Sequence, residues 1–531
     1  MSLSRNYLVA SVASFLLSNA ALAAAPTLPV SSGQDSITTG HVTIGHTTVP
    51  YRAIAGNLLV HEHKYDDSQH VIEENTGEKL GKNQSKENDN AHDAVASMFY
   101  VAYVKEGVKS ADRPITFVYN GGPGSASVWL HMGSFGPVRL DTPGDFHLPA
   151  APYKLINNSQ SLLDVTDLVF VDAPGTGFGR IAGQDHEKAF YGVDEDGHAF
   201  TRFIAQFLAK YNRYNSPKYL LGESYGTMRS AVVINDLQDD ENIDFNGVIL
   251  LSQILNYENN IDAPRANPGI DEPYELALPS YAATAWYHNV LPHKPTDLPK
   301  FLAEVEQFAI TDYTVALHQG ADLPQAQRQA IAEKLHDYTG LSVDYLLQGD
   351  LRITGGQFSK HLQQATGMTT GRLDSRFSGP SLNLMSEEAG YDPQSTAISS
   401  AYISAFNDYA RTVLHYGDSQ RYLGGIDPTW NYRHKQPGMG TSDLGANVMP
   451  DLANAMKTNP QLHVMLNAGY YDLATPFYEG IYEMKHLPIP PNLQKNIEYK
   501  QYFSGHMVYV DPASLQELHD NMANFINRTH N

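Results

Sequence analysis

The chain has 531 residues, with 36 Lys and Arg against 58 Asp and Glu, a formal net charge of −22 and no cysteine. The acidic balance disfavours binding to nucleic acid or to an anionic membrane surface, because both depend on Lys and Arg that neutralise phosphates. The lack of cysteine excludes disulfides, thiolate metal sites and cysteine nucleophiles, so any nucleophile is oxygen or nitrogen.

Residues 1–23 have the pattern of a Sec-type signal peptide. Arg5 precedes an apolar stretch from Tyr7 to Leu17, and Ala21-Leu22-Ala23 provides an A-x-A cleavage site. The apolar run is shorter than the roughly 20 residues that a membrane-spanning helix needs. We therefore expect removal of residues 1–23, export to the periplasm or beyond, and a mature chain without membrane association. Export without disulfides fits a bacterial origin better than a eukaryotic secretory one.

Residues 66–93 are rich in Gly, Asn and charged side chains and have little apolar content to bury. Such a composition predicts a mobile surface loop. The preceding His61-Glu62-His63 alternates polar side chains on a strand-like segment, which is typical of a solvated face. We expect neither a metal nor a cofactor.

Strand and helix patterns alternate after this loop. Apolar side chains between residues 200 and 211 recur at the i, i+3, i+4 spacing of a helix face. Short apolar runs before and after it predict strands at 115–119, 168–171, 219–221 and 248–251. Alternation of this kind predicts an α/β fold with a mostly parallel sheet covered by helices on both faces, and residues 24–257 would form the N-terminal part of this core.

The strand signal fades between residues 258 and 436. Helical patterns at 301–308, 323–338 and 399–414 predict a mainly helical insertion, or cap, over this region. Residues 437–531 would complete the core, because strand character returns at 463–467 and a helix pattern at 513–526 closes the chain.

Gly222-Glu223-Ser224-Tyr225-Gly226 matches the pattern G-x-S-x-G. A short apolar strand precedes it and a helix pattern follows, which is the setting of a nucleophile elbow. Glycines on both sides allow a sharp turn that exposes the serine hydroxyl at the edge of the sheet. The sequence therefore predicts Ser224 as a nucleophile.

A serine nucleophile needs an imidazole base that a carboxylate orients. In α/β-hydrolases the order along the chain is nucleophile, acid and base, with acid and base in loops after late strands. Asp472 follows the strand predicted at 463–467, and His506 follows residues 499–503 just before the last helix. We therefore predict a triad of Ser224, Asp472 and His506.

Two backbone N–H groups are needed to stabilise the oxyanion of an acyl-transfer intermediate. One belongs to the residue after the nucleophile, here Tyr225, and the other to a loop after an early strand. Asn120-Gly121-Gly122-Pro123-Gly124 directly follows the strand predicted at 115–119 and is in place to supply the second.

Four sequence blocks together resemble the signatures of the serine carboxypeptidases. The resemblance spans roughly residues 96 to 526 and implies an α/β-hydrolase fold, a helical insertion near the active site and removal of C-terminal residues from peptides that have a free C-terminus. It also implies oxyanion donors at Gly122 and Tyr225, a grip on the substrate's C-terminal carboxylate by Asn120, Gly121 and Glu223, and Met507 at the pocket for the leaving residue. The blocks are residues 119–127, 222–226, 469–472 and 505–507.

Two positions depart from the pattern of the family's eukaryotic members. Ser125 replaces a cysteine after the Gly-rich block, and Ser134 replaces a second glutamate before Gly136-Pro137. A hydroxyl can donate to a carboxylate, so we expect Ser134 to take part in substrate binding. Loss of that glutamate also leaves open the possibility of an esterase or acyltransferase with the same triad. A third hypothesis is a catalytically silent binding protein on the same fold. The sequence leaves the oligomeric state open.

Overall fold

The computed structural model describes residues 33–63, 65, 94–142, 144–262, 264–439, 441–442 and 446–530. The predicted signal peptide at 1–23 and the predicted loop at 66–93 lie outside the described residues. In the parts of the chain that the structure describes, no helix combines the length and apolar character required to cross a membrane.

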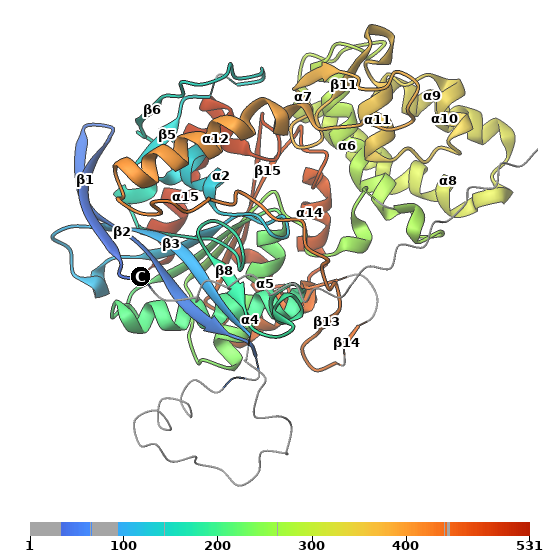
Figure 1. The fold of residues 1–531 in the computed structure, drawn as a ribbon. Coiled ribbons are helices and arrows are strands. Elements are labelled where there is room, and N and C mark those ends of the chain that lie inside the picture. The colour runs from blue at the N-terminus through green and yellow to red at the C-terminus, as the bar shows by residue number, and fades with distance from the viewer. Residues whose placement is uncertain are drawn as a thin grey trace, which may run out of the picture.

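A ten-stranded mixed sheet forms the centre of the molecule (Figure 1). Its strands are β1 (Ser36–Ile44), β2 (Thr47–His61), β3 (Val95–Lys105), β4 (Ile115–Tyr119), β7 (Asp167–Val171), β8 (Arg180–Ala182), β9 (Lys218–Glu223), β10 (Gly247–Leu251), β15 (His463–Gly469) and β16 (Ile497–Tyr502). The order is β1-β2-β3-β7-β4-β9-β10-β15-β16, with β8 paired to β3. All neighbours from β7 to β16 are parallel, which confirms the predicted α/β class.

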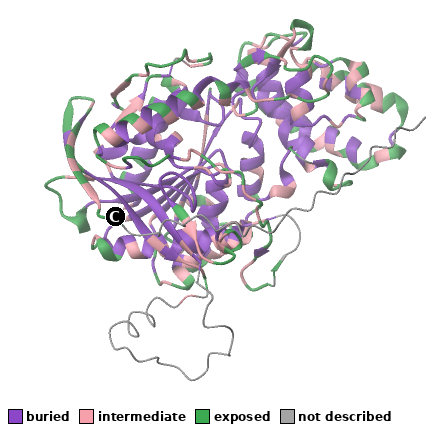
Figure 2. Ribbon diagram, in the orientation of Figure 1, coloured by how far each residue is buried: buried purple, intermediate pink, exposed green. Residues whose placement is uncertain are grey.

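The inner parallel strands are buried along their whole length, as Figure 2 shows in purple. Apolar side chains alternate between the two faces, so that Phe117 and Tyr119 belong to one core cluster and Val118 to the other. Helices α4 (Val193–Lys210), α5 (Tyr225–Asp239) and α13 (Met449–Thr458) cover the first face. Helices α12 (Pro393–Thr412) and α15 (Pro512–Thr529) cover the second. Burial on both faces explains why these strands read as continuous apolar runs.

Strands β1, β2 and β3 form an antiparallel edge, of which the sequence pattern indicates only the strand-like segment at 61–63. β2 extends over 15 residues, and buried and exposed side chains alternate only in its first half. Because the burial pattern changes within the strand, the alternation of apolar and polar residues that is typical of a strand does not extend over its whole length.

The helical region, at the upper right in Figure 1, carries its own apolar core. Its helices are α6 (Glu272–Tyr287), α7 (Leu298–Phe308), α8 (Thr314–Gln319), α9 (Gln325–Thr339), α10 (Val343–Gln348) and α11 (Gly355–His361), with α14 (Phe477–Lys485) packed against α6. Helix α12 packs on the sheet instead. Residues 258–436, expected as one insertion, therefore divide between two packing groups.

The remaining α-helices and strands are short. They are α2 (Val128–Leu130), α3 (His186–Phe190) and the strand pairs β5 (Val138–Leu140) with β6 (Leu155–Asn157), β11 (Met368–Thr370) with β12 (Ser378–Pro380), and β13 (His434–Lys435) with β14 (Thr441–Ser442).

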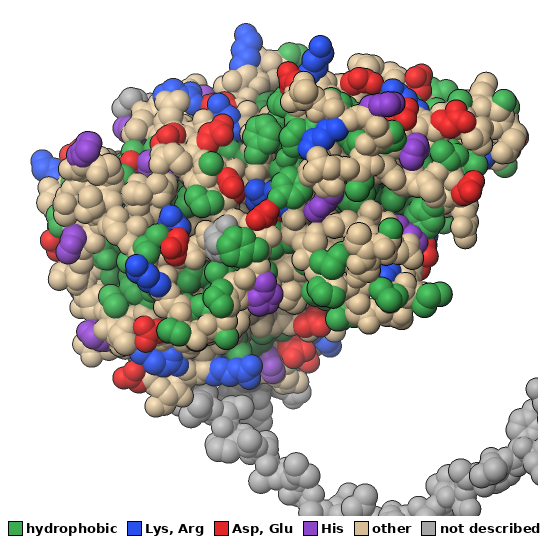
Figure 3. All heavy atoms as spheres, turned by 90° about the horizontal axis from the view of Figure 1, so that it is seen from above, with side chains coloured by type: hydrophobic (Ala, Val, Ile, Leu, Met, Phe, Trp, Pro, Cys, Tyr) green, Lys and Arg blue, Asp and Glu red, His purple; other side chains and the backbone are tan. Residues whose placement is uncertain are grey.

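Acidic and basic side chains are interspersed with apolar ones on the face seen in Figure 3. Among the described residues drawn on that face, Lys and Arg do not gather into one basic patch, as a phosphate-binding surface would require.

Candidate active site

Ser224 occupies the sharp turn between β9 and α5. Its φ of 60° and ψ of −131° lie in a sparsely populated region, which costs a non-glycine residue about 1 to 3 kcal/mol. A Cβ on Gly222 would lie 2.2 Å from the carbonyl oxygen of Gly226, so only glycine fits there. The turn is held from both sides, because Ser224 N donates to Leu251 O (3.0 Å) and the Thr227 hydroxyl donates to Ser224 O (2.7 Å).

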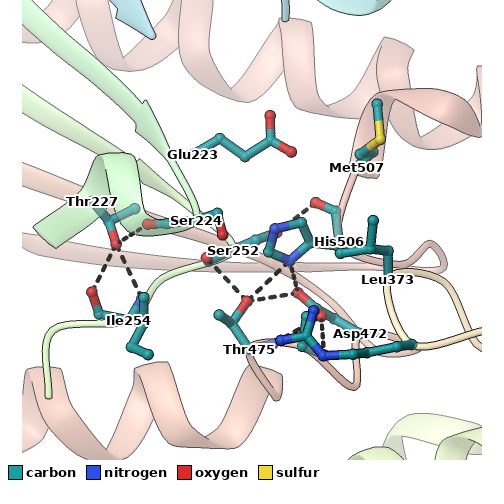
Figure 4. A network of polar contacts seen from close by, with 12 residues as sticks. Glu223, Ser224, Thr227, Ser252, Ile254, Leu373, Asp472, Thr475, His506 and Met507 are labelled. Atoms are coloured by element: carbon teal, nitrogen blue, oxygen red, sulfur yellow. Dashed lines mark hydrogen bonds and ion pairs between the residues drawn. The ribbon is translucent and has the colours of Figure 1, made fainter. Parts of the chain in front are cut away.

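Asp472 and His506 lie side by side because they follow neighbouring parallel strands, β15 and β16. Nδ1 of His506 is 2.8 Å from Oδ2 of Asp472, and both side chains are buried (Figure 4). With Nδ1 facing the carboxylate, Nε2 is the ring nitrogen left for a nucleophile.

Asp472 is fully buried, and backbone and hydroxyl donors satisfy its carboxylate. Oδ1 accepts from the backbone N–H groups of Ala474 (2.8 Å) and Thr475 (3.0 Å). The Thr475 hydroxyl lies 2.8 Å from Oδ2 and 3.1 Å from Nδ1 of His506. These hydrogen bonds fix the orientation of the carboxylate, which fixes the imidazole in turn. Thr475 carries no signature that could identify it from sequence.

The surroundings of His506 raise its pKa above the ordinary value. Burial opposes the charge, but the carboxylates of Asp472 and Glu223 outweigh it. The backbone of His506 is also held, because its N–H donates to Leu373 O (2.6 Å) and its carbonyl accepts from the Ser252 hydroxyl (2.6 Å). A segment of the predicted insertion thus contacts the loop that carries the imidazole.

Ser224 and His506 line one cavity of about 380 Å³. Among the described residues, the structure records no hydrogen bond between their side chains. Such bonds are often long without substrate and shorten when it binds. The arrangement in Figure 4 suits attack by the hydroxyl and proton transfer to the ring.

The Gly-rich block lies directly against the start of α5. A Cβ on Gly121 would come within 2.4 Å of Tyr225 N and 2.6 Å of Gly226 N, so this close approach requires glycine. Gly122 has a φ of 109° and lines the cavity with Gly121 and Ser224. Both predicted oxyanion donors therefore belong to segments that meet beside the nucleophile.

A buried ion pair contacts the Gly-rich block through the carbonyl of Asn120. Arg229 and Asp196 form a 2.6 Å pair with side chains at most 1% exposed. Arg229 Nη1 also donates to the carbonyl of Asn120 (2.7 Å), and its guanidinium stacks 4.2 Å from the Phe200 ring. Since Arg229 lies on the helix that begins after Ser224, one helix positions both segments.

Glu223 and Asn120 form the polar end of the cavity. Oε2 of Glu223 accepts from Asn120 Nδ2 (2.6 Å) and from the Tyr509 hydroxyl (2.8 Å). Burial raises the pKa of Glu223 to about 7, although His506 and these hydrogen bonds act in the opposite direction. Gly121 and Met507 line the same cavity, so the structure brings together all the residues expected to bind substrate except one.

The exception is Ser134, and the expectation that its hydroxyl binds substrate is wrong. Ser134 lies in the helical turn His131–Phe135, is fully buried and donates to Leu130 O (2.6 Å). Serine in a helix commonly bonds back to the carbonyl four residues earlier, and this bond uses its only proton. Ser134 is not among the described residues that line the cavity.

The other departure from the family pattern is accommodated locally. The Ser125 hydroxyl accepts from Trp129 Nε1 (2.9 Å), and both residues line the cavity.

Asp262 and Arg372 form an ion pair in the cavity lining. The described residues contain no group of three His, Asp or Glu side chains placed to hold a metal ion.

Comparisons with known proteins agree with this arrangement. The profile of the family described as serine carboxypeptidase matches residues 87–508. A segment of 145 residues is 30% identical to pheromone-processing carboxypeptidase KEX1 of Yarrowia lipolytica, and one of 170 residues is 27% identical to serine carboxypeptidase ctsa-3.2 of Caenorhabditis elegans. These segments cover 27% and 30% of this chain and only 22% and 31% of the two relatives.

The fold also matches a solved structure. The crystal structure of KEX1(delta)p, a prohormone-processing carboxypeptidase from Saccharomyces cerevisiae, aligns with a TM-score of 0.52 and 14% identity over 90% of this chain and 91% of that chain. The likeness confirms the predicted α/β-hydrolase fold. Because the family profile matches most of its length, the chain belongs to the serine carboxypeptidase family.

Proposed function

We propose that this protein removes residues one at a time from the C-terminus of peptides through an acyl-enzyme intermediate. The observation that carries the proposal is the buried Glu223 and Asn120 pair in the cavity that also contains Ser224 and His506. A carboxyl and an amide next to a nucleophile suit a substrate whose reacting bond lies one residue from a free carboxylate.

In the first half of the reaction, the Ser224 hydroxyl attacks the carbonyl of the last peptide bond while His506 accepts its proton at Nε2. Asp472 holds the imidazole in orientation and stabilises its charged form. The N–H groups of Gly122 and Tyr225 stabilise the oxyanion. The intermediate then collapses as the C–N bond breaks, and His506 returns the proton to the departing amine.

In the second half, water replaces the amine. His506 removes a proton from the water molecule, whose oxygen attacks the acyl carbonyl, and then protonates Ser224 Oγ as the ester bond breaks. The products are a peptide shortened by one residue and a regenerated serine. Met507 borders the position of the leaving residue.

Digestion of a peptide library, free and C-terminally amidated, tests the proposal by mass spectrometry. Free peptides should shorten one residue at a time and amides far more slowly, because an amide leaves the donors of the carboxylate site poorly paired. Equal rates on both forms would contradict the carboxypeptidase assignment and favour an esterase. A fluorophosphonate that labels parent protein but not Ser224→Ala distinguishes an enzyme from a silent binding protein.

We further propose that residues 1–23 are removed on export and that the enzyme acts in the periplasm or outside the cell. The support is the Arg5, apolar stretch and A-x-A pattern of the sequence. Mass spectrometry of the mature N-terminus after cell fractionation tests it, and an intact Met1 on cytoplasmic protein would contradict it.

A further inference from the structure

One carboxylate oxygen of Glu223 contacts a phenol, whereas the family pattern places a second glutamate at residue 134. Residue 134 has no carboxyl, and the hydroxyl of Ser134 is directed to Leu130 O. The Tyr509 hydroxyl instead donates to Oε2 of Glu223 at 2.8 Å. Tyr509 is 1% exposed and lies in the short turn Val508–Val510, three residues after His506.

Tyr509 packs against the same turn that carries Ser134. A Cβ on the adjacent Gly133 would lie 2.7 Å from the Tyr509 ring and 2.5 Å from the Tyr402 hydroxyl. The two phenols thus fill the space beside residues 131–135. Only Tyr509 is hydrogen-bonded to Glu223, since the buried Tyr402 hydroxyl has no partner among the described residues.

Both hydrogen bonds to Glu223 end on the same oxygen. Oε2 receives Asn120 Nδ2 and the Tyr509 hydroxyl, which leaves Oε1 for the cavity that Glu223 lines. An oxygen that already accepts two donors is a poor place for a further proton. When Glu223 is neutral, its proton therefore belongs on Oε1, where it can be donated to an incoming carboxylate.

Four titratable groups lie near Glu223 on the elements packed around it. They are His506 and Asp472 on the loops after β16 and β15, Tyr509 on its turn and Tyr402 on α12. His506 and Tyr509 favour the charged form of Glu223, and Asp472 opposes it. Asp472 and His506 are unchanged when Tyr509 is replaced, so comparing the variant with the parent on substrates with and without a carboxylate isolates the effect of Tyr509.

We propose that Tyr509 is a positioning residue for carboxylate recognition and takes the place of the missing second carboxyl. Together with Asn120 it fixes Oε2 of Glu223, so that Oε1 presents a proton to the substrate. The inference rests on the proposed carboxypeptidase function. It makes the recognition site a carboxyl with a neutral phenol partner, which does not titrate near neutral pH, in place of a pair of carboxyls that repel when charged.

Tyr509→Phe tests the proposal because it removes one oxygen and keeps the ring. The measurement is kcat/KM for a free peptide divided by that for its amide, from pH 5 to pH 9. Loss of a donor that favours the charged carboxylate should move the midpoint of this ratio upward by about one pH unit. Loss of the constraint on Glu223 should also raise KM for the free peptide about 3- to 10-fold below pH 6, with kcat nearly unchanged.

Tyr402→Phe is the matched control, since it removes an equally buried phenol oxygen that makes no hydrogen bond to Glu223. It should leave the midpoint in place. A Tyr509→Phe variant that lowers activity on both substrates equally, with an unmoved midpoint, would show a merely structural role and overturn the proposal.

Binding to an inactive background separates this inference from the proposed function. N-acetyl-Ala-Phe and its amide would be titrated calorimetrically into Ser224→Ala, with and without Tyr509→Phe. If Ser224→Ala prefers the free acid and Tyr509→Phe weakens this preference at pH 5.5, the inference is supported. This holds even if the parent fails to hydrolyse peptides, because that failure would refute only the proposed carboxypeptidase activity. Equal binding of acid and amide would overturn the inference whatever the parent hydrolyses.

Discussion

Replacement of Glu223 by Gln should remove the pH dependence of carboxylate recognition. The side-chain oxygen of Gln can take the place of Oε2 and accept from Asn120 and Tyr509, because both donors converge on one oxygen. Its NH₂ group then occupies the place of Oε1 and donates to the substrate at every pH. The variant therefore imitates the neutral form of Glu223.

The size of the effect follows from the pKa of Glu223, which burial raises to about 7. At pH 9, two units above that value, about 1% of the parent remains neutral, so its preference for free over amidated peptide should fall about 100-fold from the plateau at pH 5. Glu223→Gln should stay within about threefold of the parent at pH 5 and keep that preference at pH 9. Above pH 8 the variant should exceed the parent on free peptides.

The assay is the ratio of kcat/KM for a free peptide to that for its amide, measured from pH 5 to pH 9 in buffers of constant ionic strength. Proton transfer through His506 is common to both substrates and cancels in the ratio, whereas the charge of His506 also lowers the pKa of Glu223 in the parent. If the ratio for Glu223→Gln falls as steeply with pH as that of the parent, another group titrates and the assignment of Glu223 to the substrate carboxylate is wrong.

Three further predictions concern other parts of the molecule. Ser224→Ala should lower kcat by about 10⁶-fold in steady-state assays at unchanged stability, and activity within tenfold of the parent would refute its role. Arg229→Met should lower the free energy of unfolding, measured in urea, by about 3 to 5 kcal/mol, because it leaves Asp196 buried and unpaired. The double variant Arg229→Met with Asp196→Leu should recover most of this loss, and an equal loss in the single and double variants would contradict the pairing. His434 is buried between two aspartates, which outweigh the effect of burial and raise its pKa to about 9. The stability that the charged imidazole contributes is fully present below its ordinary pKa near 6.5 and is lost as the pH rises through 9. His434→Gln should therefore cost about 1 to 3 kcal/mol at pH 6 and little at pH 10, and a loss independent of pH in thermal unfolding would contradict this.

The sequence predicts those parts of the site that follow from local patterns. Ser224 stands in a short motif between a strand and a helix, and Asp472 and His506 each follow an apolar strand. Because the ends of parallel neighbouring strands meet at one edge of a sheet, these three predictions need only the order of elements along the chain. Their residues accordingly lie together in the structure.

Interactions between distant segments could not be predicted in this way. Thr475 and Tyr509 carry no motif, and the partner of Tyr509, Glu223, is 286 residues away along the chain. The error at Ser134 has a related origin. Comparison with the family pattern identifies a missing carboxyl, but only coordinates reveal that the hydroxyl is already used by the backbone of its own turn.

The geometry links the nucleophile and the carboxylate site through one helix. Ser224 precedes α5, Arg229 within α5 donates to the carbonyl of Asn120, and the Asn120 side chain donates to Glu223, which directly precedes Ser224. These linked contacts fix the distance between the Ser224 hydroxyl and the Glu223 carboxyl, to which we assign the substrate's terminus. A shift of α5 would move Ser224 and Glu223 together. Under the proposed function, the elbow would thus set the register of cleavage, one residue from a free carboxylate, while the predicted insertion contributes Arg372 and Leu373 to the cavity lining and holds the backbone of His506.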